Sequence, residues 1–235
     1  GKKVISHEGE LLKVWSDQLT TDPSVAAKVE FYKRKVAAEI GGVVGRSKVR
    51  LVRNYQAESL LGDFVSDVMR AVSGADVAIT NAGGLRADLP EGPITKGDVL
   101  DALPFENTLV VCEMTGAQIR EVLEQGFTLE RGMVQVSGLR ATYDLERPRG
   151  KRLVQLRIGN RPLQDQELYR VATNSFLAQG GDLYQTFLRT KQSPGFSKKP
   201  GISTGLIISG DKENLRPDYI VMGTRMQIHY GCHSE

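Results

Sequence analysis

Residues 76–86 read Asp-Val-Ala-Ile-Thr-Asn-Ala-Gly-Gly-Leu-Arg, a short apolar run that leads directly into a glycine-rich turn. The run 76–80 is typical of a buried strand, because it is short, mostly apolar and followed by turn residues. The paired Gly83 and Gly84 permit a positive φ and the close approach of a ligand. Asn81 and Arg86 would present a neutral amide and a fixed cation at this turn. The stretch therefore predicts a sheet with a loop suited to binding at the end of one strand.

Helix and strand patterns alternate on both sides of this stretch without a strict βαβ rhythm. Asp22 is the expected N-cap of the first helix, and Thr115 with Gln118 forms a capping box for a later one. A surface loop is expected at 190–205. Helices are predicted at 22–41, 57–72, 95–103 and 115–125, and strands at 46–52, 76–80, 108–114, 134–145, 153–158, 168–173 and 219–228. This order predicts an α/β or α+β fold with a mixed sheet.

The composition narrows the class of protein. The chain has 235 residues, of which 40% are hydrophobic and 25% charged, so a globular fold of one large or two small domains is expected and a disordered chain is excluded. No apolar run reaches the length of about 18 residues that a membrane helix needs. The net charge of +3 comes from scattered basic residues, which argues against a nucleic-acid partner. Cys112 and Cys232 are too few for a disulfide framework and do not indicate a compartment.

The first residues suggest that the chain is part of a longer protein. Residues 1–14 lack a signal-peptide pattern and an initiator Met, so a targeting signal is expected upstream. Residues 2–14 suggest a strand–turn–strand at the end of a preceding domain, and 16–21 suggest a linker.

The sequence shows no catalytic centre of its own. It lacks a phosphate-binding glycine loop and a Gly-x-Ser-x-Gly turn. His229, Cys232 and His233 have a spacing that could ligate a metal, but a frayed terminus is the simpler interpretation. We therefore expect neither a metal nor another cofactor in this chain.

Two further loops resemble the first in chemistry. Residues 103–107 place Phe105 on a turn, and residues 176–182 combine Phe176, Gly181 and Asp182. Two rings, an amide, a guanidinium and a carboxylate suit a nucleoside, with the rings stacked on the base and the carboxylate accepting from the ribose. The alternatives are that both rings belong to the core, that the glycines are ordinary turns and that Asp182 is a helix N-cap. Arg86 would then be a solvated charge or the partner of a nearby Asp.

The loops NAGGLR (81–86), LPFENTLV (103–110) and FLAQGGD (176–182) occur in the order found in the C-terminal domain of the 5′-nucleotidase family, which they resemble. Three supporting segments are similar to the family too: AESLLGDFVSDVMR (57–70), ITKGDVLDALPF (94–105) and MTGAQIREVLEQG (114–126). The resemblance covers about residues 45–190, and the helix at 22–41 resembles the family's linker helix.

The resemblance implies one half of a secreted, periplasmic or cell-surface hydrolase. An N-terminal metallophosphatase domain would hold two divalent metal ions, and this chain would hold the nucleotide and be inactive by itself. The implied division is 1–21 as the end of the preceding domain and linker, 22–42 as the linker helix, and 43–235 as the substrate-binding domain. The implied fold is α+β, a four-layer α/β/β/α sandwich with mixed sheets.

The resemblance also assigns roles to single residues. Asn81 is similar to the residue that contacts the base, and Arg86 to an arginine on the phosphate side. Phe105 and Phe176 resemble the two rings that enclose the base, and Asp182 resembles the residue that binds ribose. Gly83, Gly84 and Gly181 lie in the same motifs.

Two departures from the family pattern qualify these roles. Tyr55 stands where many members carry an Arg, three residues before Glu58, so we expect extra substrate phosphates to matter less unless Arg53 supplies the cation. Ala82 replaces a frequent Gly. The rival interpretation is a non-catalytic module that binds a nucleoside or another small ligand.

Overall fold

The structure, a computed structural model, describes residues 3–13, 15, 19–194 and 226–228. It consists of two units, residues 1–40 and 41–235. In the first unit, α1 (Pro23–Ile40) begins after Asp22, whose carboxylate accepts from the backbone N–H groups of Ser24 at 2.8 Å and Val25 at 3.1 Å. The predicted N-cap is thereby confirmed. No side chain of α1 is buried within the described residues.

The strand–turn–strand predicted for residues 2–14 is wrong where it can be judged, since residues 3–13 form neither strand nor helix. An isolated two-stranded hairpin is marginally stable in water, and an apolar pattern alone does not supply a sheet for it to join.

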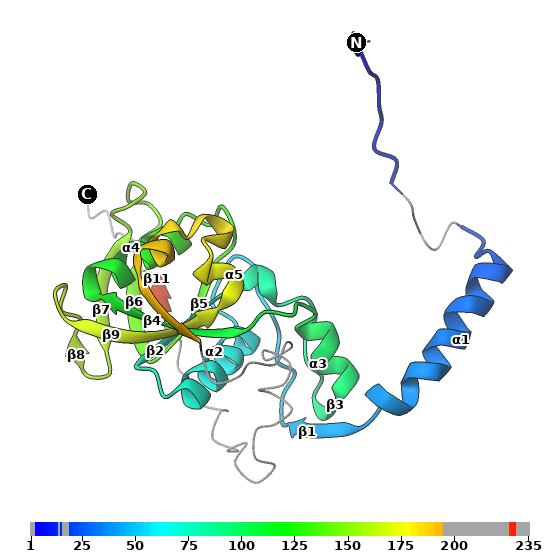
Figure 1. The fold of residues 1–235 in the computed structure, drawn as a ribbon, viewed down its shortest axis with the longest axis horizontal. Helices are drawn as coiled ribbons and strands as arrows, with labels where there is room; N and C mark the ends of the chain where they lie inside the picture. The colour runs from blue at the N-terminus through cyan, green and yellow to red at the C-terminus, as the bar shows by residue number, and fades with distance from the viewer. Residues whose placement is uncertain (1–2, 14, 16–18, 195–225, 229–235) are drawn as a thin grey trace, which may run out of the picture. The chain divides into compact units, whose positions relative to one another are not determined.

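The second unit alternates helices and strands (Figure 1). In chain order its elements are β1 (Val43–Ser47), α2 (Leu60–Ser73), β2 (Val77–Asn81), the 3₁₀ helix η1 (Ala82–Gly84), β3 (Gly92–Thr95), α3 (Lys96–Ala102), β4 (Leu109–Thr115), α4 (Gly116–Gly126), β5 (Val134–Ser137), β6 (Leu139–Tyr143), β7 (Leu153–Ile158), β8 (Arg161–Pro162), β9 (Leu168–Asn174), α5 (Ser175–Ala178), the 3₁₀ helices η2 (Gly181–Leu183) and η3 (Gln185–Arg189), β10 (Lys191–Pro194) and β11 (Met226–Ile228).

Three sheets organise these elements. A five-stranded sheet has the order β10-β4-β9-β2-β5, in which β2 and β9 are parallel and the other pairs antiparallel. A four-stranded sheet has the order β11-β6-β7-β8 and contains one parallel pair, β11 with β6. The strands β1 and β3 form a small antiparallel pair. The predicted α+β fold with mixed sheets is thus confirmed.

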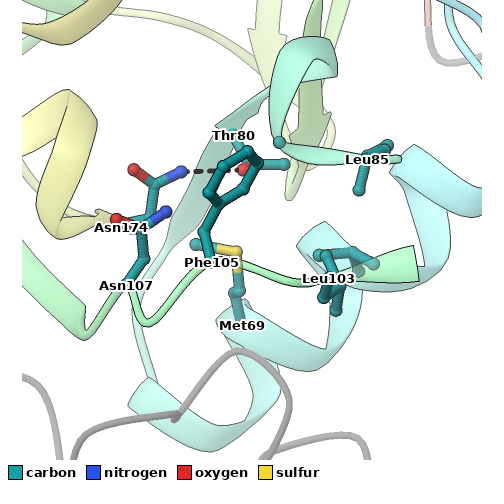
Figure 2. A pocket seen from close by; sticks show the side chains of 9 residues that line it. Met69, Thr80, Leu85, Leu103, Phe105, Asn107 and Asn174 are labelled. Atoms are coloured by element: carbon teal, nitrogen blue, oxygen red, sulfur yellow. Dashed lines mark hydrogen bonds between the residues drawn. The ribbon is translucent and has the colours of Figure 1, made fainter. Parts of the chain in front are cut away.

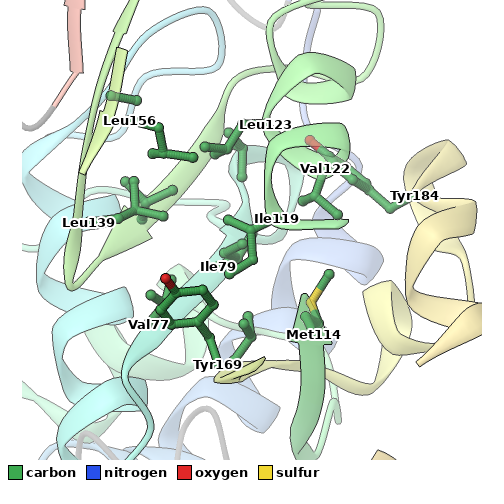
Figure 3. Packing of buried hydrophobic residues seen from close by; sticks show 14 of the residues in the cluster. Val77, Ile79, Met114, Ile119, Val122, Leu123, Leu139, Leu156, Tyr169 and Tyr184 are labelled. Atoms are coloured by element: carbon green, nitrogen blue, oxygen red, sulfur yellow. The ribbon is translucent and has the colours of Figure 1, made fainter. Parts of the chain in front are cut away.

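Both faces of the five-stranded sheet are covered. On one face, α2 buries Leu61, Val65 and Met69 in a cluster with Ala78 of β2 and Ala172 of β9. On the other face, β2, β4 and β9 share a core with α4 and with β6 and β7 of the second sheet, as the packing of Ile79, Ile119, Leu123, Leu139 and Leu156 in Figure 3 shows. Two packed sheets with helices therefore form the layers of the predicted sandwich.

Several boundaries differ from the sequence prediction. The predicted strand 134–145 is two strands, β5 and β6, which belong to different sheets because Gly138 turns the backbone with φ of 81°. The first strand of the unit is β1 at 43–47 rather than 46–52. The helix α2 starts at Leu60 rather than 57, because the side chain of Ser59 accepts from the N–H of Gly62 and caps it.

The capping box predicted at Thr115 with Gln118 is present, and Thr95 with Asp98 forms another at the start of α3. Of the loop predicted at 190–205, residues 191–194 form β10 instead, and the remainder lies outside the described residues. The strand predicted at 219–228 is seen in its described part, 226–228.

Candidate functional site

Three loops meet at one edge of the five-stranded sheet. Because β2 and β9 are parallel neighbours, their carboxyl ends, Asn81 and Asn174, lie at the same edge. The strand β4 runs antiparallel to β9 with Leu109 opposite Asn174, so the loop that precedes β4 reaches this edge too. The topology therefore brings together the three loops singled out from the sequence: 81–86, 103–107 and 176–182.

Hydrogen bonds join the three loops to one another. The N–H of Arg86 donates to the carbonyl of Ala102 at 2.8 Å, which ties the first loop to the end of α3, directly before the second loop. The N–H of Ser175 donates to the carbonyl of Thr108 at 2.8 Å, and the N–H of Thr108 donates to the Ser175 hydroxyl at 3.0 Å. The backbone next to Phe176 is thus hydrogen-bonded to the residue three positions after Phe105.

A chain of three side chains links the first loop to the third. Asn81 Nδ2 donates to Asp182 Oδ2 at 2.7 Å, and Asn174 Nδ2 donates to Asn81 Oδ1 at 3.1 Å. Asn174 also caps α5, because its Oδ1 accepts from the N–H of Leu177 at 2.9 Å. Asn81 and Asn174 are buried. In this structure Asn81 therefore holds and orients the carboxylate of Asp182.

The backbone around Asp182 is unusual. Gly180, Asp182 and Leu183 have φ values of 81°, 52° and 70°. A left-handed conformation costs a residue with a Cβ about 1 kcal/mol or more, and such strain is often found at functional sites. The interpretation of Asp182 as a helix N-cap is wrong, since it lies within η2 and its carboxylate accepts from Asn81 instead.

Phe105 and Phe176 are not core residues. They are 48% and 43% exposed, so the alternative that both rings are buried is wrong. The ring of Phe176 packs directly on Gly181, where an added Cβ would come within 2.6 Å of ring carbons. Gly83 and Gly84 lie against the Asn81 amide, where added Cβ atoms would approach Nδ2 at 3.5 Å and Oδ1 at 3.2 Å respectively. These three glycines thus allow the backbone to approach the Phe176 ring and the Asn81 amide closely.

A pocket opens beside Phe105 (Figure 2). Its polar side is formed by Thr80, Asn107 and Asn174, and its apolar side includes Met69 and Leu85. Asn107 was missed as a site residue in the sequence analysis. The signal available was an amide two residues beyond an aromatic on the same turn, which by itself is compatible with ordinary turn chemistry.

Arg86 is exposed, and its guanidinium lies 3.5 Å from the carbonyl of Gly83. The nearby carboxylate, Asp88, has other partners: it accepts from the N–H of Arg53 at 2.9 Å and pairs with Arg50 at 3.0 Å. The hydrogen bond from Arg53 and the contact with Arg50 hold the pKa of Asp88 below its usual value. Arg86 is accordingly a cation presented to solvent at the rim of the three loops.

Within the part of the chain that the structure describes, no group of three or more His, Cys, Asp or Glu side chains could hold a metal ion. His229, Cys232 and His233 lie outside that part. Cys112 is a buried free thiol on β4, and burial raises its pKa.

These loops form a candidate site at a sheet edge, with two half-exposed rings, amides and a carboxylate that is held in place. The family model "5′-nucleotidase, C-terminal domain" matches residues 43–189, and the chain belongs to this family.

Curated and solved relatives agree with this assignment. The chain is 43% identical over 143 residues to the Trifunctional nucleotide phosphoesterase protein YfkN of Bacillus subtilis, a match to 55% of this chain and 10% of that protein. It is 32% identical over 203 residues to the NAD 5′-nucleotidase of Haemophilus influenzae, covering 77% of this chain and 33% of that protein. The crystal structure of a 5′-nucleotidase precursor from Thermus thermophilus superposes with a TM-score of 0.75 at 30% identity, covering 87% of this chain and 43% of that one. The chain thus spans less than half the length of these relatives.

Proposed function

We propose that this chain is the substrate-binding domain of a metal-dependent 5′-nucleotidase-type phosphohydrolase and binds a nucleoside or nucleotide at the three loops. The observation that carries the proposal is that Phe105, Phe176 and the Asn81–Asp182 pair lie at one sheet edge, on three loops linked by hydrogen bonds. Family membership adds the class of substrate.

In this proposal the two rings enclose the base. Half-exposed rings on neighbouring loops leave aromatic faces in contact with water, and a base that covers them removes apolar surface from water. Asn107 lines the pocket beside Phe105, so its amide is in reach of the polar edge of a base.

The carboxylate of Asp182 is proposed to accept hydrogen bonds from the ribose hydroxyls. One of its oxygens already accepts from Asn81, which fixes the carboxylate before the ligand arrives. An oriented acceptor loses little side-chain entropy on binding, which favours affinity. Arg86 at the rim would then face the phosphate side as a positive charge.

Positioning is the proposed contribution of this domain to catalysis. Residues 1–21 are proposed to be the end of the preceding domain and 22–42 the linker, and the N-terminal metallophosphatase domain would carry two divalent metal ions that activate water for attack at phosphorus. By holding the base and ribose, residues 43–235 would place the phosphate for that reaction. We further propose that the whole protein acts in the periplasm or outside the cell. Among the described residues, no helix is long and apolar enough to cross a membrane.

The rival function is a binding module without an enzyme attached. Two measurements on the purified chain test the proposed nucleotide-binding function and the proposed lack of hydrolysis. Isothermal titration should give saturable one-to-one binding of adenosine and AMP, and Asp182→Ala should weaken both relative to Asp165→Asn, a control at a surface ion pair with Arg120. Absence of saturable binding in the parent would reject the nucleotide site.

AMP hydrolysis is the second measurement. We expect no hydrolysis by this chain with added Mn²⁺, Zn²⁺ or Co²⁺. Hydrolysis that persists after contaminating enzymes are removed would overturn the proposal that this chain binds the substrate and a separate domain catalyses the reaction. The coding sequence upstream separates an enzyme from a binding module, because an enzyme of this type requires a His/Asp/Asn metal cluster there.

A further inference from the structure

Tyr55 lies beside the carboxylate of the proposed site. An atom placed as Cβ on Gly83 would lie 3.5 Å from Asn81 Nδ2, 3.7 Å from Asp182 Oδ2 and 3.8 Å from Tyr55 Cε2. The ring of Tyr55 therefore faces the same small space above Gly83 that the Asn81–Asp182 pair faces. Despite this packing the residue is 42% exposed, so the tyrosine lines a surface and does not fill the core.

The segment that carries Tyr55 has no regular secondary structure, yet its backbone is held at several points. The N–H of Met133 donates to the carbonyl of Tyr55 itself at 2.7 Å. On one side the N–H of Arg53 donates to Asp88 at 2.9 Å, and on the other Gln135 Nε2 donates to the carbonyl of Ala57 at 3.0 Å. A half-exposed ring on a backbone fixed in this way occupies one place before any ligand binds.

Gly132 fixes the ring itself. Its φ is +83°, and an added Cβ would come within 2.9 Å of both Cε2 and the carbonyl oxygen of Tyr55. The tyrosine ring thus packs on bare backbone on one side, with Gly83 and Asp182 near the same edge. The Cε2 edge of the ring thus lies close to both Gly132 and Gly83, and the 42% exposure of Tyr55 leaves part of the side chain open to a ligand.

The polar groups around this ring are complementary in hydrogen bonding. Asp182 is an acceptor, whereas the phenol of Tyr55 is a neutral donor. Tyr184, buried beneath, has a raised pKa because of burial and, in addition, the nearby Asp182 and Tyr55. The two tyrosines and the carboxylate are therefore close enough to influence one another.

We infer that Tyr55 is a specificity-determining residue of this site, whose ring covers the sugar of a bound nucleoside and whose hydroxyl donates a hydrogen bond to a sugar oxygen. The inference rests on the proposed function. Asp182, the proposed ribose acceptor, and Tyr55 meet above Gly83, whereas the base is proposed to lie between the rings of Phe105 and Phe176. Tyr55 therefore acts on the sugar and contributes nothing to recognition of the free base.

The test compares adenosine with adenine, a ligand that lacks the sugar, in titrations of the purified chain. Tyr55→Phe removes the hydroxyl alone, and a neutral hydrogen bond is worth about 2- to 12-fold in affinity. We expect Tyr55→Phe to weaken adenosine binding by about that factor, Tyr55→Ala to weaken it further, and both to bind adenine within about 2-fold of the parent. Tyr32→Phe, at an exposed tyrosine of α1, is the matched control and should leave both ligands unchanged.

The possible results distinguish a failure of the role inferred for Tyr55 from a failure of the proposed function. If the parent binds adenosine and both Tyr55 variants bind it equally well, the inference is wrong and the proposed function stands. Equal loss of adenine and adenosine binding by Tyr55→Phe, with a thermal melt like that of the parent, would also overturn it, because the hydroxyl would then recognise the base. If the parent binds neither ligand, the proposed function fails and the role of Tyr55 fails with it.

Discussion

Removal of either aromatic ring, by Phe105→Ala or Phe176→Ala, separates a binding role from a structural one. A fully buried Phe→Ala change costs about 3–5 kcal/mol of stability. Since these rings are 48% and 43% exposed, roughly half of that cost applies, about 1.5–2.5 kcal/mol. In a domain of this size a loss of about 1 kcal/mol in unfolding free energy lowers Tm by roughly 2–4 °C. The Tm of each variant should therefore fall by several degrees, and the protein should remain folded at 25 °C.

Binding should suffer more than folding. Stacking of a base on an aromatic side chain is worth about 1–3 kcal/mol in proteins that bind single-stranded nucleic acids, which corresponds to about 5- to 150-fold in Kd. Each variant should therefore bind adenosine at least about 5-fold more weakly while still melting cooperatively. Isothermal titration and differential scanning calorimetry on the same preparations measure the two effects separately.

The matched control is Phe31→Ala, a phenylalanine of α1 that is 56% exposed. It should leave adenosine affinity unchanged. The reasoning would be refuted if Phe105→Ala and Phe176→Ala bound adenosine like the parent, or if either lost stability as a buried phenylalanine would.

Three further predictions concern close contacts and charge. Gly62→Ala should cost about 3–5 kcal/mol in urea unfolding, because its Cβ would come within 1.9 Å of Gln135 Oε1, a buried hydrogen-bonded group. Gly181→Ala should displace the Phe176 ring and weaken adenosine binding with a smaller loss of stability, since its Cβ would lie 2.6 Å from the ring. Asp88 has a lowered pKa in the folded state, so its ionised carboxylate stabilises the fold above about pH 4, and this stabilisation is lost as the pH falls through the lowered pKa. Asp88→Asn should therefore lose less stability than the parent on acidification.

Two control variants belong with these measurements. An added Cβ at Gly42 meets nothing within 4 Å, so Gly42→Ala should unfold and bind like the parent. Asp101 is an exposed acid on α3, and Asp101→Asn should keep the parent's acid sensitivity. A stable Gly62→Ala, normal adenosine binding by Gly181→Ala, or an Asp88→Asn variant as acid-sensitive as the parent would each contradict the corresponding argument.

Local signals in the sequence predicted local structure well. The caps at Asp22, Thr95 and Thr115 were readable because a side chain and its backbone partner lie within three residues of each other. The bounds of β7 were predicted as observed. The break at Gly138 was missed, because a glycine inside an apolar run is compatible with a continuous strand until sheet pairing determines its φ.

The site was predictable as a list of loops but not as an arrangement. The bond between Asn81 and Asp182 joins residues 101 positions apart, and it depends on the parallel pairing of β2 with β9, which neither strand's own sequence specifies. The exposure of Phe105 could not be predicted for the same reason, since an aromatic on a turn is buried or exposed according to which loops surround it. The placement of Tyr55 beside Gly83 likewise required the fold.

A crystal structure of this chain in complex with adenosine tests the central claim most directly. The account predicts the base between the rings of Phe105 and Phe176, with ribose hydroxyls within hydrogen-bond distance of the Asp182 carboxylate. Adenosine bound elsewhere on the chain, or bound at this edge with its base away from both rings, would contradict the account.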